Sequence, residues 1–112
     1  MKKILAKGIP ASLGTVTGRI IIVKDPFKFN FSRLLPSENY IMVARYTNPD
    51  FEIIMGCCQG FISEKGGITN HLSIVARELG RPAIVGVEHA TEIFKDGMRV
   101  ELNATTGEIL AT

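Results

Sequence analysis

The chain has 112 residues, of which 46% are hydrophobic, enough to bury the core of one domain that we place at residues 1–112. Thirteen Lys and Arg side chains stand against eleven Asp and Glu, giving a net charge of +2 without any basic run, which excludes a nucleic-acid surface. No apolar run approaches the roughly 20 residues that span a bilayer, so a transmembrane helix is excluded as well.

The N-terminus and the cysteines predict a reducing compartment. After Lys2 and Lys3 the apolar stretch is three residues long, shorter than the roughly 7–15 residues of a secretion signal. We therefore expect a cytoplasmic protein in which Cys57 and Cys58 stay reduced. These adjacent thiols are expected to be small hydrophobic side chains near a helix end. No Cys or His partner stands at zinc-binding spacing, so no metal site is predicted.

The first half of the chain predicts two strands and one helix. An apolar, β-branched run predicts a strand over 14–23, which Asp25-Pro26 ends. The next dozen residues contain three alternating phenylalanines and predict either an edge strand or a loop that covers the core. A short buried strand is predicted over 40–44. Asn48 as N-cap, with a proline after it, predicts a helix that runs to about residue 58.

The second half alternates between strands and helices. Strands are predicted over 61–63 and 83–85, and the helix His71 to Leu79 lies between them, closed by Gly80. A helix over 88–95 and two final strands, over 98–102 and 108–110, follow. Strands that alternate with helices require crossover connections, as parallel neighbours do. The fold class is therefore predicted to be α/β, with a further β layer from the strand-rich ends.

The segment from Lys65 to Gly80 carries the most chemical information. On a helical wheel, its apolar residues between 72 and 79 gather on one face, which must pack against the sheet. His71 lies at the border of that face, in the first turn. Arg77 falls on the far side, so we expect it to be solvated and assign it no role.

The start of this helix is suited to an anion. A first helical turn has unpaired N–H groups, and Gly66 and Gly67 let the backbone approach a ligand closely. Thr69 adds a hydroxyl at the capping position, and the imidazole of His71 can carry a phosphoryl group covalently. Ordinary helix capping beside a surface histidine is the alternative interpretation. His89 has a similar placement without a glycine pair, so it is expected to be a surface residue.

These residues also resemble a known family. The segment 66–71, Gly-Gly-Ile-Thr-Asn-His, and the segment 74–86 closely resemble the phosphohistidine swivelling domain of phosphoenolpyruvate-utilising enzymes, and weaker likeness extends over nearly the whole chain. The resemblance implies a compact β/β/α domain in which His71 is the phosphorylated nucleophile. It assigns phosphate contacts to Thr69, Gly67, Gly66 and Asn70. Asn70 departs from the family pattern, which usually has Ser or Cys at this position.

The function implied by this resemblance is that of a stand-alone phosphocarrier domain or subunit. In the family, an ATP-grasp partner holds ATP and Mg²⁺ and loads the histidine, and a (β/α)₈ barrel binds pyruvate or phosphoenolpyruvate. At 112 residues the chain has room for neither, so both are expected on partners. A non-catalytic swivelling module that binds a partner or a small anion is the first alternative. The small subunit of an aconitase-like dehydratase is the second.

Overall fold

A computed structural model of the chain describes residues 2–112. It contains eight strands, three short α-helices and three 3₁₀ turns. In chain order they are β1 (Ile4–Lys7), β2 (Ile9–Ser12), β3 (Thr15–Ile22), η1 (Pro26–Lys28), η2 (Phe31–Arg33), β4 (Tyr40–Ala44), η3 (Pro49–Phe51), α1 (Glu52–Gly56), β5 (Gly60–Ser63), α2 (His71–Leu79), β6 (Ala83–Val85), α3 (Ala90–Ile93), β7 (Arg99–Asn103) and β8 (Glu108–Ala111).

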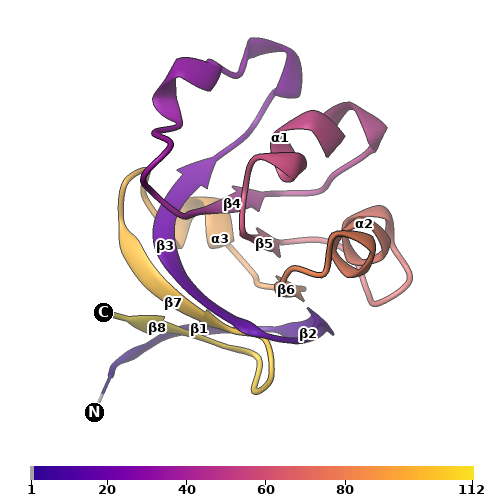
Figure 1. Cartoon of the computed structure of the whole chain (residues 1–112). Helices are drawn as coiled ribbons and strands as arrows, with labels where there is room; N and C mark the ends of the chain where they lie inside the picture. Colours follow the sequence, from indigo (N-terminus) through magenta and orange to yellow (C-terminus); the bar gives the residue numbers. More distant parts are fainter. Residues whose placement is uncertain (1) are drawn as a thin grey trace.

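All eight strands belong to one mixed sheet, in the order β1-β8-β7-β3-β4-β5-β6-β2. The four central strands β3, β4, β5 and β6 run parallel, and the remaining pairs are antiparallel. Figure 1 shows the strong curvature of this sheet, with α1 and α2 on one side and α3 on the other. The predicted α/β class is confirmed. No helix within residues 2–112 is long and apolar enough to cross a membrane.

A single glycine joins the two edges of the sheet. Gly8 is the only residue between β1, on one edge, and β2, on the other. Its N–H donates to the carbonyl of Gly107 at 2.9 Å, and a Cβ at this position would lie 2.6 Å from the carbonyl oxygen of Val85. The chain therefore crosses a space that is too narrow for a side chain. This close passage requires the sheet to curl until its edges meet.

The central strands are buried on both faces, as parallel strands in α/β proteins are. In β4 the side chains alternate between two core clusters: Met42 and Ala44 pack with the residues of α1 and α2, whereas Ile41 and Val43 pack with α3 and β7. All five residues of this strand are buried. The predicted continuous apolar strand over 40–44 is confirmed. The two clusters hold one helical layer on each face of the sheet.

The predicted elements differ from the observed ones mainly where tertiary contacts decide. The helix at 71–79 and its Gly80 cap are confirmed, but the one predicted over 88–95 shortens to Ala90–Ile93. The phenylalanine segment forms two 3₁₀ turns, and Phe29 packs against the core, so the loop alternative is correct. The helix predicted from Asn48 begins as a 3₁₀ turn and ends at Gly56. Strands β1 and β2 were not predicted.

The two cysteines lie just after α1, as predicted, in different surroundings. Cys57 is exposed and Cys58 is fully buried in the core. Burial, together with the neighbouring Cys57, raises the pKa of the Cys58 thiol to about 12, and Arg81 offsets part of this effect. A thiol with such a pKa stays protonated and unreactive at neutral pH. Cys58 is therefore a small hydrophobic side chain, as expected.

Candidate functional site

The candidate site lies at the carboxyl edge of the parallel strands, where ligands of α/β proteins commonly bind. Thr47 follows the end of β4, and Glu52 opens α1 a few residues later. After β5, a loop leads into α2, whose first residue is His71. Although 24 residues separate them in sequence, the Thr47 hydroxyl and the His71 ring are in hydrogen-bond contact. The adjacency of β4 and β5 in the sheet brings these segments together.

His71 is held through both of its ring nitrogens. Its Nδ1 lies 2.8 Å from Oγ1 of Thr47, and its Nε2 lies 2.9 Å from a carboxylate oxygen of Glu52. The side chain is 21% exposed, whereas that of Glu52 is 49% exposed. A carboxylate can only accept a hydrogen bond, so Nε2 carries the hydrogen. In the neutral ring Nδ1 is then the acceptor, and the Thr47 hydroxyl donates to it.

Helices α1 and α2 are tied together, which fixes the spacing between Glu52 and His71. The guanidinium of Arg81, just after α2, donates to the carbonyls of Met55, Gly56 and Cys58 at the end of α1, at 3.2, 2.9 and 2.7 Å. Carbonyls at the end of a helix have few partners within the helix, and Arg81 supplies them with hydrogen bonds here. The two helices therefore form one frame around the histidine.

The loop before α2 is shaped by Gly66, which has a φ of +106°. This conformation is strained for any other residue, and a Cβ there would collide with the side-chain amide of Asn70. The carbonyl of Gly67 accepts from the N–H of Asn70 at 3.2 Å and from the hydroxyl of Ser73 at 2.8 Å. The loop therefore folds back onto the first turn of α2 and keeps the helix start compact.

Asn70, and not Thr69, is the N-cap of α2, which corrects the predicted capping role of Thr69. The side-chain oxygen of Asn70 accepts from the N–H of Ser73 at 3.1 Å and from its hydroxyl at 2.8 Å. A cap residue needs extended backbone, and Asn70 has it, with φ −80° and ψ 172°. Thr69 is exposed, and its hydroxyl makes no hydrogen bond with residues 2–112. It remains available to a ligand.

Arg77 has a structural role that the sequence did not suggest. Its side chain leaves α2 on the solvent side, as predicted, but the guanidinium donates to the carbonyl of Ala11 in β2 and to that of Ile68, both at 2.8 Å. The expectation of a merely solvated side chain was wrong, because a long arginine can reach back along the surface to carbonyls of a neighbouring strand. Arg77 anchors the loop before His71 to the sheet edge.

Sequence reasoning missed the two partners of His71. Thr47 directly precedes Asn48, which the sequence indicated only as the start of a helix, and Thr47 itself received no role. No pattern in the chain singles out Glu52, because an acid in the first turn of a helix is common. Only the pairing of β4 with β5 could have placed the two beside the histidine.

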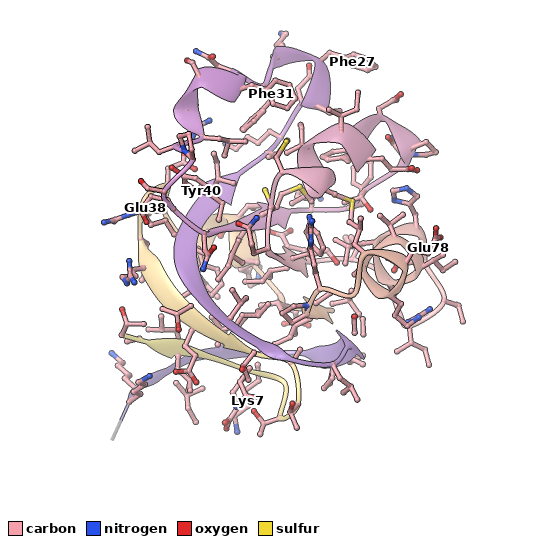
Figure 2. The ribbon with its side chains drawn as sticks, viewed as in Figure 1. Lys7, Phe27, Phe31, Glu38, Tyr40 and Glu78 are labelled. Atoms are coloured by element: carbon pink, nitrogen blue, oxygen red, sulfur yellow. The ribbon has the colours of Figure 1, made fainter. Side chains whose placement is uncertain are left out.

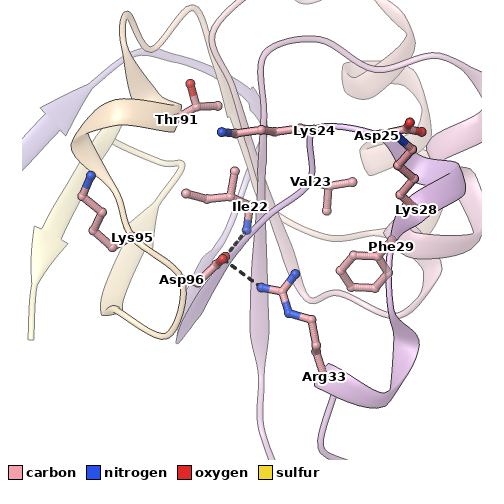
Figure 3. A pocket seen from close by; sticks show the side chains of 10 residues that line it. All are labelled: Ile22, Val23, Lys24, Asp25, Lys28, Phe29, Arg33, Thr91, Lys95 and Asp96. Carbon is pink, nitrogen blue, oxygen red and sulfur yellow. Dashed lines mark hydrogen bonds and ion pairs between the residues drawn. The ribbon is translucent and has the colours of Figure 1, made fainter.

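A hollow of about 500 Å³ lies elsewhere on the carboxyl edge of the sheet (Figure 3). Lys24, Lys28 and Lys95 line it together with the ion pair of Arg33 and Asp96, at 2.9 Å. The same carboxylate accepts the N–H of Ile22 at 2.7 Å. The residues of this hollow come from the end of β3 and the segment after it, the 3₁₀ turns, α3 and the segment after α3, and none belongs to α2. It is therefore distinct from the histidine site.

Within residues 2–112, no group of three or more His, Cys, Asp or Glu side chains is placed to hold a metal ion. The ring nitrogens of His71 contact one carboxylate, that of Glu52, and one hydroxyl, that of Thr47. The chemistry that this arrangement offers is that of an oriented imidazole, which can act as a nucleophile or exchange protons.

The chain belongs to the family described as PEP-utilising enzyme, mobile domain, whose pattern matches residues 36–107. The matched span includes Thr47, Glu52 and the whole segment from Gly66 to His71. The resemblance noted in the sequence is thereby confirmed at the level of the family.

Two relatives show how the domain occurs in longer proteins. A probable phosphoenolpyruvate synthase of Staphylothermus marinus is 35% identical over 107 residues, which are 96% of this chain and 13% of that protein. A rifampicin phosphotransferase of Bacillus cereus is 35% identical over 102 residues, 91% of this chain and 11% of that protein. The chain therefore spans only a small part of the length of these relatives.

Solved structures agree with the fold. A solution structure of an Enzyme I protein is 32% identical and has a TM-score of 0.57, over 65% of this chain and 30% of that one. Aconitase X from Thermococcus kodakaraensis has a TM-score of 0.67 over 96% of this chain and 97% of its own, with 16% identity. At that identity the likeness concerns the fold alone, so it gives no support to a dehydratase function.

Proposed function

We propose that this domain relays a phosphoryl group through His71, between a phosphoryl donor and an acceptor held by other domains or chains. The observation that carries the proposal is the oriented imidazole of His71 at the N-terminus of α2, fixed by Thr47 in a domain of the PEP-utilising family. An imidazole is a competent nucleophile for phosphoryl transfer, and catalysis of such transfer depends mainly on positioning.

The nitrogen that we propose as the phosphorylated atom is Nε2. The contact of Nδ1 with Thr47 is partly buried, whereas the contact of Nε2 with Glu52 lies on the exposed side. A donor held by another domain can approach only from the exposed side. The Thr47 hydroxyl can donate to Nδ1 in the resting ring and also when Nε2 carries a phosphoryl group. Thr47 therefore acts as a positioning residue.

We assign the phosphate contacts to the loop that precedes His71. Thr69 has a free hydroxyl, and the backbone of Gly66 and Gly67 lies at the surface without side chains. The oxygen of the Asn70 side chain is engaged by Ser73, so only its amide N–H groups can serve a phosphate. The N-terminal end of the helix dipole favours an anion at this place.

The partners in this proposal are an ATP-grasp nucleotide-binding subunit or domain, which would hold ATP and Mg²⁺, and an acceptor site. Pyruvate or phosphoenolpyruvate is one acceptor. The relatedness to both a phosphoenolpyruvate synthase and a rifampicin phosphotransferase supports a phosphoryl relay with either kind of acceptor. We place the reaction in the cytoplasm, where ATP is available and thiols stay reduced.

A non-catalytic binding module is the second candidate. It is favoured by one observation: both ring nitrogens of His71 already have partners within the chain. In such a module His71 would be a structural link between α1, α2 and the segment after β4. Phosphorylation of His71, measured as described next, separates the relay from the binding module.

The test is intact-protein mass spectrometry after incubation with Mg²⁺, lysate of the source organism and either ATP or phosphoenolpyruvate. We expect one acid-labile phosphoryl group on the wild type and on His89→Ala, and none on His71→Ala. A thermal melt should show that His71→Ala remains folded, because the ring lies at the edge of the core. The relay is refuted if wild type stays unmodified while a co-purifying ATP-grasp partner is demonstrably active.

A further inference from the structure

The carboxylate of Glu52 contacts Nε2 of His71, the nitrogen that the proposed relay must use. The carboxylate oxygen lies 2.9 Å from this nitrogen, on the exposed side of the ring. Because the carboxylate can only accept, this contact keeps a hydrogen on Nε2. A nitrogen that bears hydrogen has no free electron pair in the ring plane and cannot attack phosphorus. The geometry of the free domain is therefore that of an unreactive histidine.

The carboxylate also stands where an incoming group would arrive. The N–H of Nε2 points at Glu52, and a phosphoryl group on Nε2 would extend from the ring in the same direction. Phosphoryl donors and the phosphoryl group itself are anionic, so a carboxylate at that place repels them. Glu52 is half exposed and belongs to the first turn of α1, so its side chain can rotate away without unfolding a helix.

We propose that Glu52 is a latch that keeps His71 unreactive in the free domain and opens when a cationic side chain of the donor protein pairs with its carboxylate. This inference rests on the proposed phosphoryl relay and names how the same site is regulated. A lysine or arginine of the donor that captures Glu52 frees Nε2 at the moment of docking. Phosphorylation of His71 by unselected small phosphodonors is thereby restricted in the undocked domain.

The chemical step balances through the two tautomers of the ring. When the latch opens, Nε2 loses its hydrogen to solvent and Nδ1 gains one, which it donates to the Thr47 hydroxyl. The free pair of Nε2 then forms the N–P bond, and the P–O bond of a phosphoanhydride donor breaks, with its electron pair staying on the leaving oxygen. The proton on Nδ1 is released to solvent, and the Thr47 hydroxyl donates to Nδ1 again. A hydroxyl can both donate and accept a hydrogen bond.

The first test uses phosphoramidate, a small phosphodonor that needs no partner protein. Its P–N bond breaks with release of ammonia as His71 is phosphorylated. We expect Glu52→Gln and Glu52→Ala to be modified about three- to ten-fold faster than wild type, a modest factor because the carboxylate of Glu52 is half exposed and its contact with the ring is therefore weakened by solvent. The matched control is Glu78→Gln, which removes an exposed carboxylate on α2 (Figure 2) and should react at the wild-type rate.

The second measurement reads the tautomer directly. In ¹⁵N spectra of the neutral ring, His71 of the wild type should carry its hydrogen on Nε2. In Glu52→Gln the form with hydrogen on Nδ1 should become measurable. The latch is overturned if the tautomer is unchanged in Glu52→Gln and Glu52→Ala. It is equally overturned if both variants react with phosphoramidate no faster than Glu78→Gln.

The third measurement uses the partner protein and separates this inference from the relay itself. With lysate, Mg²⁺ and ATP, Glu52→Gln should load more slowly than wild type when the partner is limiting, because the docking ion pair is lost, and should approach the wild-type rate when the partner is in excess. A loss of ten-fold or more that persists with the partner in excess would make Glu52 part of the transfer chemistry and would overturn the latch. If no variant is loaded by an active partner, the relay fails, and with it the docking step that opens the latch; a faster reaction of Glu52→Gln with phosphoramidate would then show only that Glu52 shields Nε2.

Discussion

Two helices of this domain begin at or beside a histidine, and only one of these histidines is held. His71 opens the nine-residue helix α2, has two hydrogen-bond partners and is 21% exposed. His89 precedes the four-residue helix α3, is 71% exposed and has only a loose contact with Glu92, at 3.7 Å. The residues immediately before them do not explain this difference. The partners of His71 come from the segments that follow β4.

The two helix starts are also capped in different ways. Asn70 caps α2 from within its own loop. The side chain of His89 makes no capping contact, and its backbone is left-handed with φ +59°. The N–H of Thr91 instead donates to the carboxylate of Glu64, at 2.8 Å. A local cap can be sought among the few residues before a helix, although Thr69 was taken for Asn70 here, whereas a cap that arrives from another strand cannot. The comparison teaches that a histidine becomes a candidate nucleophile through its tertiary neighbours.

The largest effect is expected from the glycine that shapes the start of α2. Gly66→Ala should lower the free energy of unfolding by about 2–3 kcal/mol, because φ is +106° and the new Cβ would collide with the Asn70 side chain. Chemical denaturation measures this loss. Gly67→Ala is the control, since a Cβ there meets nothing within 4 Å. Equal stability of the two variants would show that the loop adapts freely.

Removing one hydrogen-bond partner should leave the ring of His71 less firmly oriented, closer to the exposed and loosely held ring of His89. Thr47→Val keeps the shape of the side chain but removes the hydroxyl that holds Nδ1. We expect phosphorylation of His71 to slow about ten-fold, because this factor corresponds to the free energy that one hydrogen bond typically contributes. Thr47→Ser should restore most of the rate. Phosphoryl incorporation over time measures it, and an unchanged rate in Thr47→Val would remove Thr47 from the site.

The remote cap of α3 should make part of the stability depend on pH. Burial alone would raise the pKa of Glu64, but hydrogen bonds from the hydroxyl and N–H of Thr91, with the charge of Arg45, hold it below its usual 4.5. A carboxyl whose pKa is lower in the folded state stabilises above the unfolded pKa. That stability is lost as the pH falls through the folded value.

The variant Glu64→Gln tests this contribution. At pH 7 it should be about 1 kcal/mol less stable than wild type, because a neutral amide replaces an ionised acceptor. The difference should shrink below about pH 4.5, as the carboxyl of the wild type protonates. Thermal melts across this range measure it. A difference that stays constant with pH would mean that Glu64 acts by packing alone.

The smallest expected effect concerns the strained residue before α3. His89→Gly should raise the free energy of unfolding by about 0.5 kcal/mol, because relief of the left-handed strain exceeds the added freedom of the unfolded chain. His89→Ala retains the strain and should show no gain. Thermal melts of the two variants measure this difference in stability, and phosphoryl loading should be unchanged in both.

The sequence predicted the parts of this molecule that local chemistry determines. The buried strand β4, the helix α2 with Gly80 after it and the α/β class all follow from apolar periodicity and caps. The roles of Thr47, Glu52 and Arg77 depend on contacts between distant segments, so no local pattern reveals them. Strands β1 and β2 were not predicted because each is only four residues long and because their partners, β8 and β6, lie at opposite ends of the strand order.

The pairing of the first and last strands has a mechanical consequence. Strands β1 and β8 are antiparallel, the N–H of Ala111 donates to the carbonyl of Lys3 at 2.8 Å, and both ends of the chain leave on the same side (Figure 1). Tension applied between residues 2 and 112 would break the hydrogen bonds between β1 and β8 one after another, starting at the ends of the chain. The first bonds to break lie far along the sheet from α2, so moderate pulling would spare the geometry around His71.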